Sequence, residues 1–175
     1  MANWYGAAAT AMFFACGLCP ASAGQPRLAA SAVREMIRTE GADKAVRRLF
    51  EDRATEGALL NGIGTGGAGW PRVAQELRPV SDGAASEGLD IAIQDALPRN
   101  PVGVLTLVRQ GAFSATSACG NYGSDERPMP VILPLSWSKR ANTVTKVAVP
   151  SLAAERKACL DALARIGMNL ARVRE

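Results

Sequence analysis

Apolar residues recur along most of the chain with the three-to-four-residue spacing of amphipathic helices. The clearest case ends at Pro98, and Asp82 or Ser86 can cap its start. Its apolar positions fit one helical face without exception, namely Ala85, Leu89, Ala92, Ile93, Ala96 and Leu97. The opposite face carries Glu87, Gln94 and Asp95, so we expect these three residues to face solvent.

Similar patterns, bounded by caps, glycines and prolines, predict helices in the rest of the chain. The expected segments are 28–39, 44–52, a helix opened by Thr55, 70–78, 102–108, 135–149 and 151–166. Asp43 is expected to cap the second of them, and Gly167 to end the last. Strands remain an alternative at 102–108, a short apolar run, and at 143–149, which is rich in β-branched residues. We favour helix in both and predict one all-α domain of about seven or eight short helices, packed as stacked α-hairpins.

The start of the chain has a different character, because no charged residue precedes Arg27. The apolar run at 4–18 is too short to span a bilayer comfortably, and the Ala-Ser-Ala at 21–23 matches an A-x-A cleavage pattern. We therefore expect a signal peptide at 1–23, a helical domain at 24–167 and a frayed tail at 168–175. The expected location is the periplasm or the medium. Since no Lys or Arg precedes the run, an uncleaved leader that anchors the chain in the membrane is the main alternative.

Removal of residues 1–23 leaves two of the four cysteines, Cys119 and Cys159. Because exported proteins meet an oxidising compartment, we expect this even pair to form a disulfide. The bridge would close a loop of about 40 residues and stabilise the fold by up to roughly 4 kcal/mol on the chain-entropy model. The alternative is two separate buried thiols.

The composition removes several classes of function. The chain has a formal net charge of +4, but its basic residues are scattered, which indicates a solvated surface and not a nucleic-acid site. It contains no histidine, and this excludes Ser-His-Asp and Cys-His catalysis as well as His-based zinc sites. We predict no metal, no cofactor and no catalytic residue.

Two short motifs match known sites formally. Gly62, Gly64 and Gly67 fit G-x-G-x-x-G, but the segment before them looks helical, whereas dinucleotide binding needs a strand there. Ser136 and Lys139 fit the S-x-x-K of penicillin-binding proteins, but no K-T-G follows. We interpret the first motif as a loop between helices and the second as a chance match.

The block SDGAASEGLDIAIQDALPRNPVGVL, with a late cysteine and the RKACL at 156–160, resembles a group of small uncharacterised exported proteins of proteobacteria. The resemblance covers about 49–163. It implies export, a Cys119–Cys159 pairing and a helical domain. The group has no established activity, so the resemblance carries over no functional residue.

Exclusion of these chemistries leaves protein binding as the expected function. We expect a non-enzymatic protein that binds another protein in the periplasm, as an inhibitor does, or as an immunity protein does against a delivered toxin. The expected contact surface is the long polar loop at 109–129, because binding residues concentrate on loops held by a rigid scaffold. Its candidate contact residues are Phe113, Tyr122, Asp125, Glu126 and Arg127.

The alternative function is that of a hydrolase of cell-wall glycan, with Glu87 as the acid and Asp82 or Asp90 nearby. A glycan cleft normally has aromatic platforms and an acid in an apolar pocket, yet only 5% of the residues are aromatic. These carboxylates are therefore better interpreted as helix caps and as residues of a solvated face.

Overall fold

The computed structural model describes residues 28–120 and 133–172, and within these ranges the protein is helical, without a strand. Its α-helices are α1 (Ala30–Glu40), α2 (Ala42–Glu51), α3 (Arg53–Gly64), α4 (Trp70–Leu77), α5 (Gly83–Ala96), α6 (Pro101–Arg109), α7 (Leu133–Thr145) and α8 (Ala153–Arg172). Three shorter helical turns are η1 (Arg78–Val80), η2 (Thr116–Gly120) and η3 (Pro150–Leu152). The all-α prediction is confirmed, and neither 102–108 nor 143–149 is a strand. The helix expected at 135–149 ends at Thr145, however, so 146–149 is not helical. Among the described helices, none combines the length and apolar character needed to cross a bilayer.

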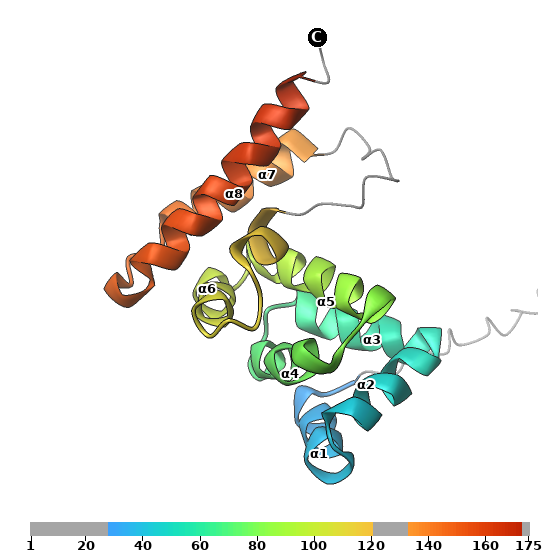
Figure 1. Cartoon of the computed structure of the whole chain (residues 1–175). Helices are drawn as coiled ribbons and strands as arrows, with labels where there is room; N and C mark the ends of the chain where they lie inside the picture. Colours follow the sequence, from blue (N-terminus) through green and yellow to red (C-terminus); the bar gives the residue numbers. More distant parts are fainter. Residues whose placement is uncertain (1–27, 121–132, 173–175) are drawn as a thin grey trace, which may run out of the picture.

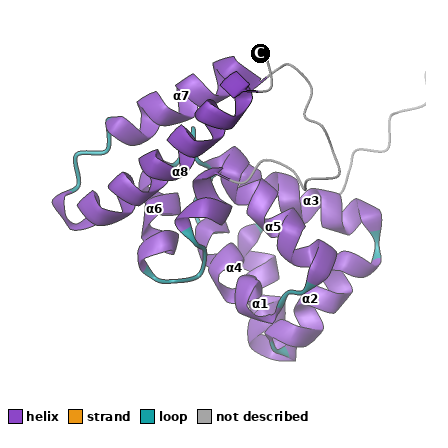
Figure 2. Cartoon of the chain, turned by 45° about the horizontal axis from the view of Figure 1, so that its top comes forward, coloured by secondary structure: helices purple, strands orange, loops and turns teal. Residues whose placement is uncertain are grey.

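The helices follow one another through the molecule roughly in chain order (Figure 1). α1 and α2 lie at one end, α3 to α6 form the middle, and α7 and α8 run side by side at the other end (Figures 1 and 2). The longest stretch of packing between two helices joins α3 and α5. Some packed pairs are neighbours in sequence, such as α1–α2, α2–α3 and α7–α8, whereas α3–α5, α6–α8 and α1–α4 join helices that are further apart in the chain.

One apolar core is shared by the described helices. Its largest fully buried apolar side chains are Leu49, Leu59, Ile63, Leu77, Leu89, Ile93, Leu97, Leu105, Leu107, Leu152 and Leu163. The predicted apolar face of α5 is confirmed at every position except Ala85, which is only partly buried. At about 25 cal/mol for each Å² of apolar surface removed from water, this shared core is the main stabilising contribution to the fold.

The prediction that Gln94 faces solvent is wrong. Gln94 is 1% exposed, because η2 packs against the side of α5 on which it lies. Its Nε2 donates a hydrogen bond of 2.7 Å to the carbonyl oxygen of Ser117 in η2. The helical period of α5 located the face that meets the main core, but it gave no sign of a second packing partner on another side.

The ends of several helices differ from the predicted caps. Asp52 and not Thr55 caps α3, since its carboxylate accepts hydrogen bonds from the Thr55 backbone N–H at 2.8 Å and from the Thr55 hydroxyl at 2.9 Å. These bonds lower the pKa of Asp52 below its usual value. Asp43 lies in the first turn of α2 and makes no cap bond, because Gly41 is the N-cap. α8 continues through Gly167 to Arg172, so the prediction that Gly167 ends it is wrong.

Asn100 caps α6 and also fastens its start to the chain that follows α3. Its Oδ1 accepts a hydrogen bond of 2.9 Å from the backbone N–H of Gly103. Its Nδ2 donates one of 2.8 Å to the carbonyl oxygen of Gly66, which has a positive φ of 66°. A single amide side chain therefore pairs a backbone N–H group in the first turn of α6 and also fixes the loop between α3 and α4.

The predicted disulfide between Cys119 and Cys159 is confirmed. It joins η2 to α8 across 40 residues, with a Cα–Cα distance of 5.4 Å and both side chains buried. The next residue, Gly120, lies so close to α8 that an added Cβ would stand 2.9 Å from the Cβ of Ala162. Since η2 also packs on α5, this turn connects α5 to α8.

Close packing explains the glycines of the G-x-G-x-x-G match. Gly62 and Gly64 belong to α3, so a helix and not a strand precedes the motif. A Cβ on Gly62 would lie 2.3 Å from Cζ2 of Trp70, the buried first residue of α4. A Cβ on Gly64 would stand 3.4 Å from the Cβ of Asp95 on α5. The glycines allow α3 to approach its two neighbours.

We expect Gly62→Ala to lower the free energy of unfolding by about 1–3 kcal/mol, because the added methyl group displaces the Trp70 ring. The matched control is Gly57→Ala on the same helix, where no atom lies within 4 Å of an added Cβ. That change should raise the free energy of unfolding by about 0.5–1 kcal/mol, since alanine loses less backbone entropy in a helix. Urea unfolding followed by circular dichroism measures both, and effects of the same sign would contradict the packing role of Gly62.

Candidate functional site

The structure places the predicted contact residue Phe113 in the core. Its ring is 3% exposed, and the guanidinium carbon of Arg78 lies 5.6 Å from the ring centroid. The chain after α6 turns back onto the helices, although its polar sequence suggested an exposed loop. Tyr122, Asp125, Glu126 and Arg127 lie outside the described residues. Phe113 is therefore removed from the predicted contact surface, and the other four residues remain predicted contacts.

The carboxylates considered for glycan hydrolysis differ in their surroundings. Glu87 is exposed on α5, and Asp82 is exposed at the N-cap of that helix. Asp90 is partly buried and forms an ion pair with Arg78, with its Oδ1 3.0 Å from Nε and its Oδ2 3.4 Å from Nη2. A cation therefore faces Asp90, whereas the glycosidase arrangement needs two carboxyl groups on either side of the substrate.

Two serines complete a polar cluster around Arg78. Its Nη1 donates a hydrogen bond of 3.1 Å to Oγ of Ser86, which lies 3.0 Å from Oγ of Ser81. Ser86 donates in turn to the carbonyl oxygen of Ser81 at 2.9 Å. The described partners of the two hydroxyls are each other, the guanidinium of Arg78 and the backbone carbonyl oxygens of Arg78 and Ser81. The cluster connects η1, α5 and the segment that carries Phe113.

The ion pair between Arg78 and Asp90 is expected to stabilise the fold. Asp90→Asn should lower the free energy of unfolding by about 1–3 kcal/mol, because it leaves a partly buried guanidinium without its counter-charge. The matched control is Glu87→Gln on the exposed side of the same helix, which should change it by less than about 0.5 kcal/mol. Urea unfolding measures both variants. A Glu87→Gln effect as large as that of Asp90→Asn would show that Glu87 has a role its exposure does not indicate.

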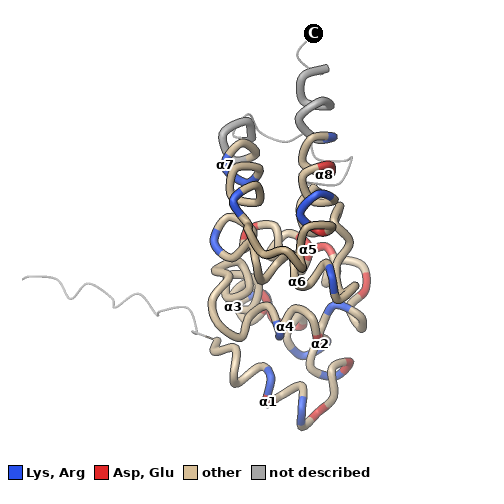
Figure 3. Tube along the Cα trace, turned by 90° about the vertical axis from the view of Figure 1, so that its left-hand side faces the viewer, with Lys and Arg blue, Asp and Glu red and all other residues tan. Residues whose placement is uncertain are grey.

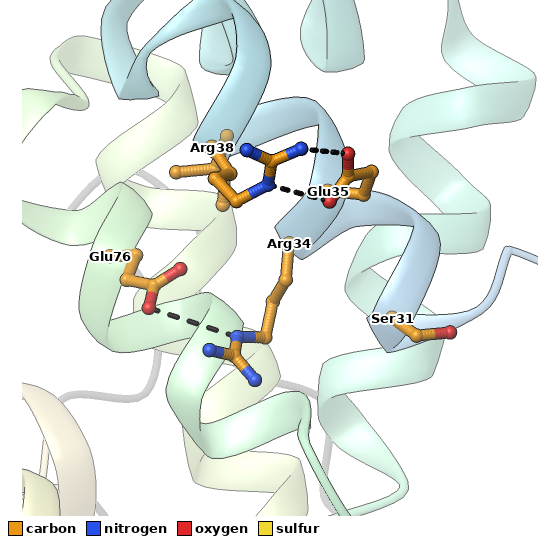
Figure 4. Close-up of a pocket in the computed structure, with 6 residues that line it drawn as sticks. Ser31, Arg34, Glu35, Arg38 and Glu76 are labelled. Atoms are coloured by element: carbon orange, nitrogen blue, oxygen red, sulfur yellow. Dashed lines mark hydrogen bonds and ion pairs between the residues drawn. The ribbon is translucent and has the colours of Figure 1, made fainter.

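A surface groove of about 430 Å³ lies between α1 and α4 (Figure 4). The residues that line it are Ser31, Arg34, Glu35, Ile37, Arg38 and Glu76. All of them belong to α1 except Glu76, which α4 contributes from the opposite side. The sequence alone does not reveal this groove. The spacing of Ser31, Arg34 and Arg38 indicates one polar helix face, but only the packing of α1 on α4 brings Glu76 toward it.

Each carboxylate of the groove is held by an arginine of its own helix. Glu35 accepts hydrogen bonds from Nε and Nη2 of Arg38 at 2.8 and 2.5 Å. These bonds lower the pKa of Glu35 and raise the pKa of Arg38. On α4, Oε1 of Glu76 accepts a hydrogen bond of 2.6 Å from Nε of Arg72. Figure 3 shows basic and acidic positions close together along the traces of α1 and α2. The lining of the groove is likewise of mixed charge, with two arginines and two glutamates.

Arg34 has weaker contacts than the other charged residues of the groove. Its side chain is 50% exposed, and its Nε lies 3.8 Å from Oε1 of Glu76, beyond hydrogen-bond distance. No described residue accepts a hydrogen bond from it. Its guanidinium therefore presents free N–H donors to any group that enters the groove. Such an open, polar site is suited to recognition by charge and hydrogen bonding.

Within the described part of the chain, no three residues of the types His, Cys, Asp and Glu are grouped so that they could hold a metal ion. The chain matches no protein-family model, no curated protein and no solved structure.

Proposed function

We propose that the protein is exported and binds another protein in the periplasm, as an inhibitor or an immunity protein does, through the groove between α1 and α4. The observation that carries this proposal is the exposed guanidinium of Arg34, which stands in the groove without a hydrogen-bond acceptor among the described residues. Arginine is enriched at protein–protein interfaces because its planar group forms several directed hydrogen bonds.

The ion pairs of the groove can be replaced by contacts with a partner at little cost in stability. The Arg38–Glu35 and Arg72–Glu76 pairs lie at the surface, where solvent screens such pairs and they contribute little to stability. They can therefore be exchanged for contacts with a partner. The helices behind them are fixed by the core, since Val33 of α1 and Val73 of α4 are fully buried. A surface on rigid helices loses little conformational entropy when it binds.

Export is supported by two features. The Cys119–Cys159 disulfide is compatible with an oxidising compartment. The apolar run and the A-x-A pattern at the start of the chain are typical of a signal peptide, although they lie outside the described residues. Tyr122, Asp125, Glu126 and Arg127 remain a second predicted contact region. No observation on the described residues favours the glycan-hydrolase alternative.

Site-specific photo-crosslinking in periplasmic extract tests the proposal. Ser31 at the groove and the exposed Ala84 on α5 are each replaced by p-benzoylphenylalanine in the disulfide-bonded protein, which then serves as bait. We expect one protein to be retained in stoichiometric amount and to crosslink from position 31 but not from position 84. Mass spectrometry identifies the product.

Two results would contradict the proposal. If no protein is retained even when cell-wall material is added, the protein-binding function is wrong. If a partner is retained but crosslinks equally from positions 31 and 84, or only from 84, the groove is not the binding surface.

A further inference from the structure

We infer that the groove between α1 and α4 receives an acidic segment of the partner protein, and that Arg34 binds a carboxylate of this segment. The inference rests on the proposed function and adds the chemistry of the partner. Figure 4 shows the arrangement behind it. Arg38 is paired with Glu35, whereas the guanidinium of Arg34 extends into the space between the helices toward Glu76.

The groove contains more hydrogen-bond donors than free acceptors. A guanidinium has five N–H donors, and those of Arg34 have no acceptor among the described residues. Its nearest carboxylate oxygen, Oε1 of Glu76 at 3.8 Å, already accepts a hydrogen bond from Arg72 at 2.6 Å. Both carboxylates of the groove are thus engaged by other arginines. The groove has surplus donors, so a fitting ligand supplies acceptors.

The charges around the groove favour an anionic ligand. The charged lining residues balance, with Arg34 and Arg38 against Glu35 and Glu76. Arg72 beside the groove also engages Glu76, so the group as a whole has one positive charge in excess, and the whole chain has a net charge of +4. A basic segment would meet Arg34 and Arg38 directly. An apolar segment would remove water from Arg34 without replacing its hydrogen bonds, which is costly for a charged group. A carboxylate supplies both the acceptor oxygens and the charge, and its two oxygens match the fork of a guanidinium.

The size and openness of the groove fit an extended segment better than a small anion. The side chains of Arg34 and Arg38 are 50% and 70% exposed, so the groove would cover only part of a small anion. Tight small-molecule sites usually bury most of their ligand. A groove of about 430 Å³ between two helices instead accommodates several side chains of an extended segment. Ile37 adds an apolar contact beside the charged groups.

Fluorescence anisotropy with defined peptides tests the inference. The probes are a fluorescein-labelled peptide of alternating glutamate and glycine and the matched peptide with glutamine in place of glutamate. The protein is the full chain with its disulfide intact, compared with Arg34→Gln and Arg47→Gln. Arg47 is a matched control, because it is exposed on α2, has no described ion pair, and its replacement removes the same charge.

We expect the wild-type protein to bind the glutamate peptide and not the glutamine peptide. Arg34→Gln should weaken this binding roughly three- to tenfold, whereas Arg47→Gln should weaken it less than about twofold. Equal losses in the two variants would overturn the inference, since they would show only a general attraction to a basic protein. Absence of binding by the wild-type protein would overturn it as well.

The same variants separate this inference from the proposed function. If the partner found by crosslinking from position 31 is retained equally well by Arg34→Gln, the partner does not place a carboxylate on Arg34, and the inference fails while the binding function stands. If no partner is retained by the wild-type protein, the binding function itself fails.

Discussion

The bridge between Cys119 and Cys159 determines how the last two helices attach to the rest of the protein. η2 carries Cys119 and packs on both α5 and α8, and α7 packs chiefly on α8. The buried amide of Gln94 fixes η2 to α5 by its bond to Ser117. Further support comes from contacts of α8 with α6, and from the ion pair between the buried Arg140 of α7 and Asp95 of α5. The disulfide is the only covalent member of this set in the described chain, and it closes a long loop.

The proposed binding groove depends on a different part of the fold. α1 lies at the end of the molecule opposite to α7 and α8, and α4 lies in the middle next to it (Figure 1). Buried residues such as Val33, Trp70 and Val73 hold the relative positions of α1 and α4. The close approach of Trp70 to Gly62 links α4 to α3. The groove is therefore expected to keep its shape when the contacts of α8 are weakened, so binding and the disulfide are separable properties.

Sequence patterns predicted those features that depend on one helix at a time. Apolar periods predicted the helices and most of the buried face of α5. The disulfide, which joins two distant segments, was predicted from the cysteine count together with the expectation of export. What they missed depends on a second partner from elsewhere in the chain. Gln94 is buried because η2 covers it, Phe113 is buried because its segment turns back onto Arg78, and the groove exists because α4 brings Glu76 to α1. Periodicity along one helix contains no information about such partners.

Hydrogen–deuterium exchange on the oxidised protein and on a Cys119→Ala/Cys159→Ala variant tests most directly whether the bridge holds α8 to the remaining helices. Amides protected only by local packing exchange through local opening, so each part of the chain reports its own stability. The account predicts that described amides of α7 and α8 lose protection in the variant, while those of α3 and α5 stay close to the oxidised protein. Unchanged protection in α7 and α8, or an equal loss in all helices, would contradict it.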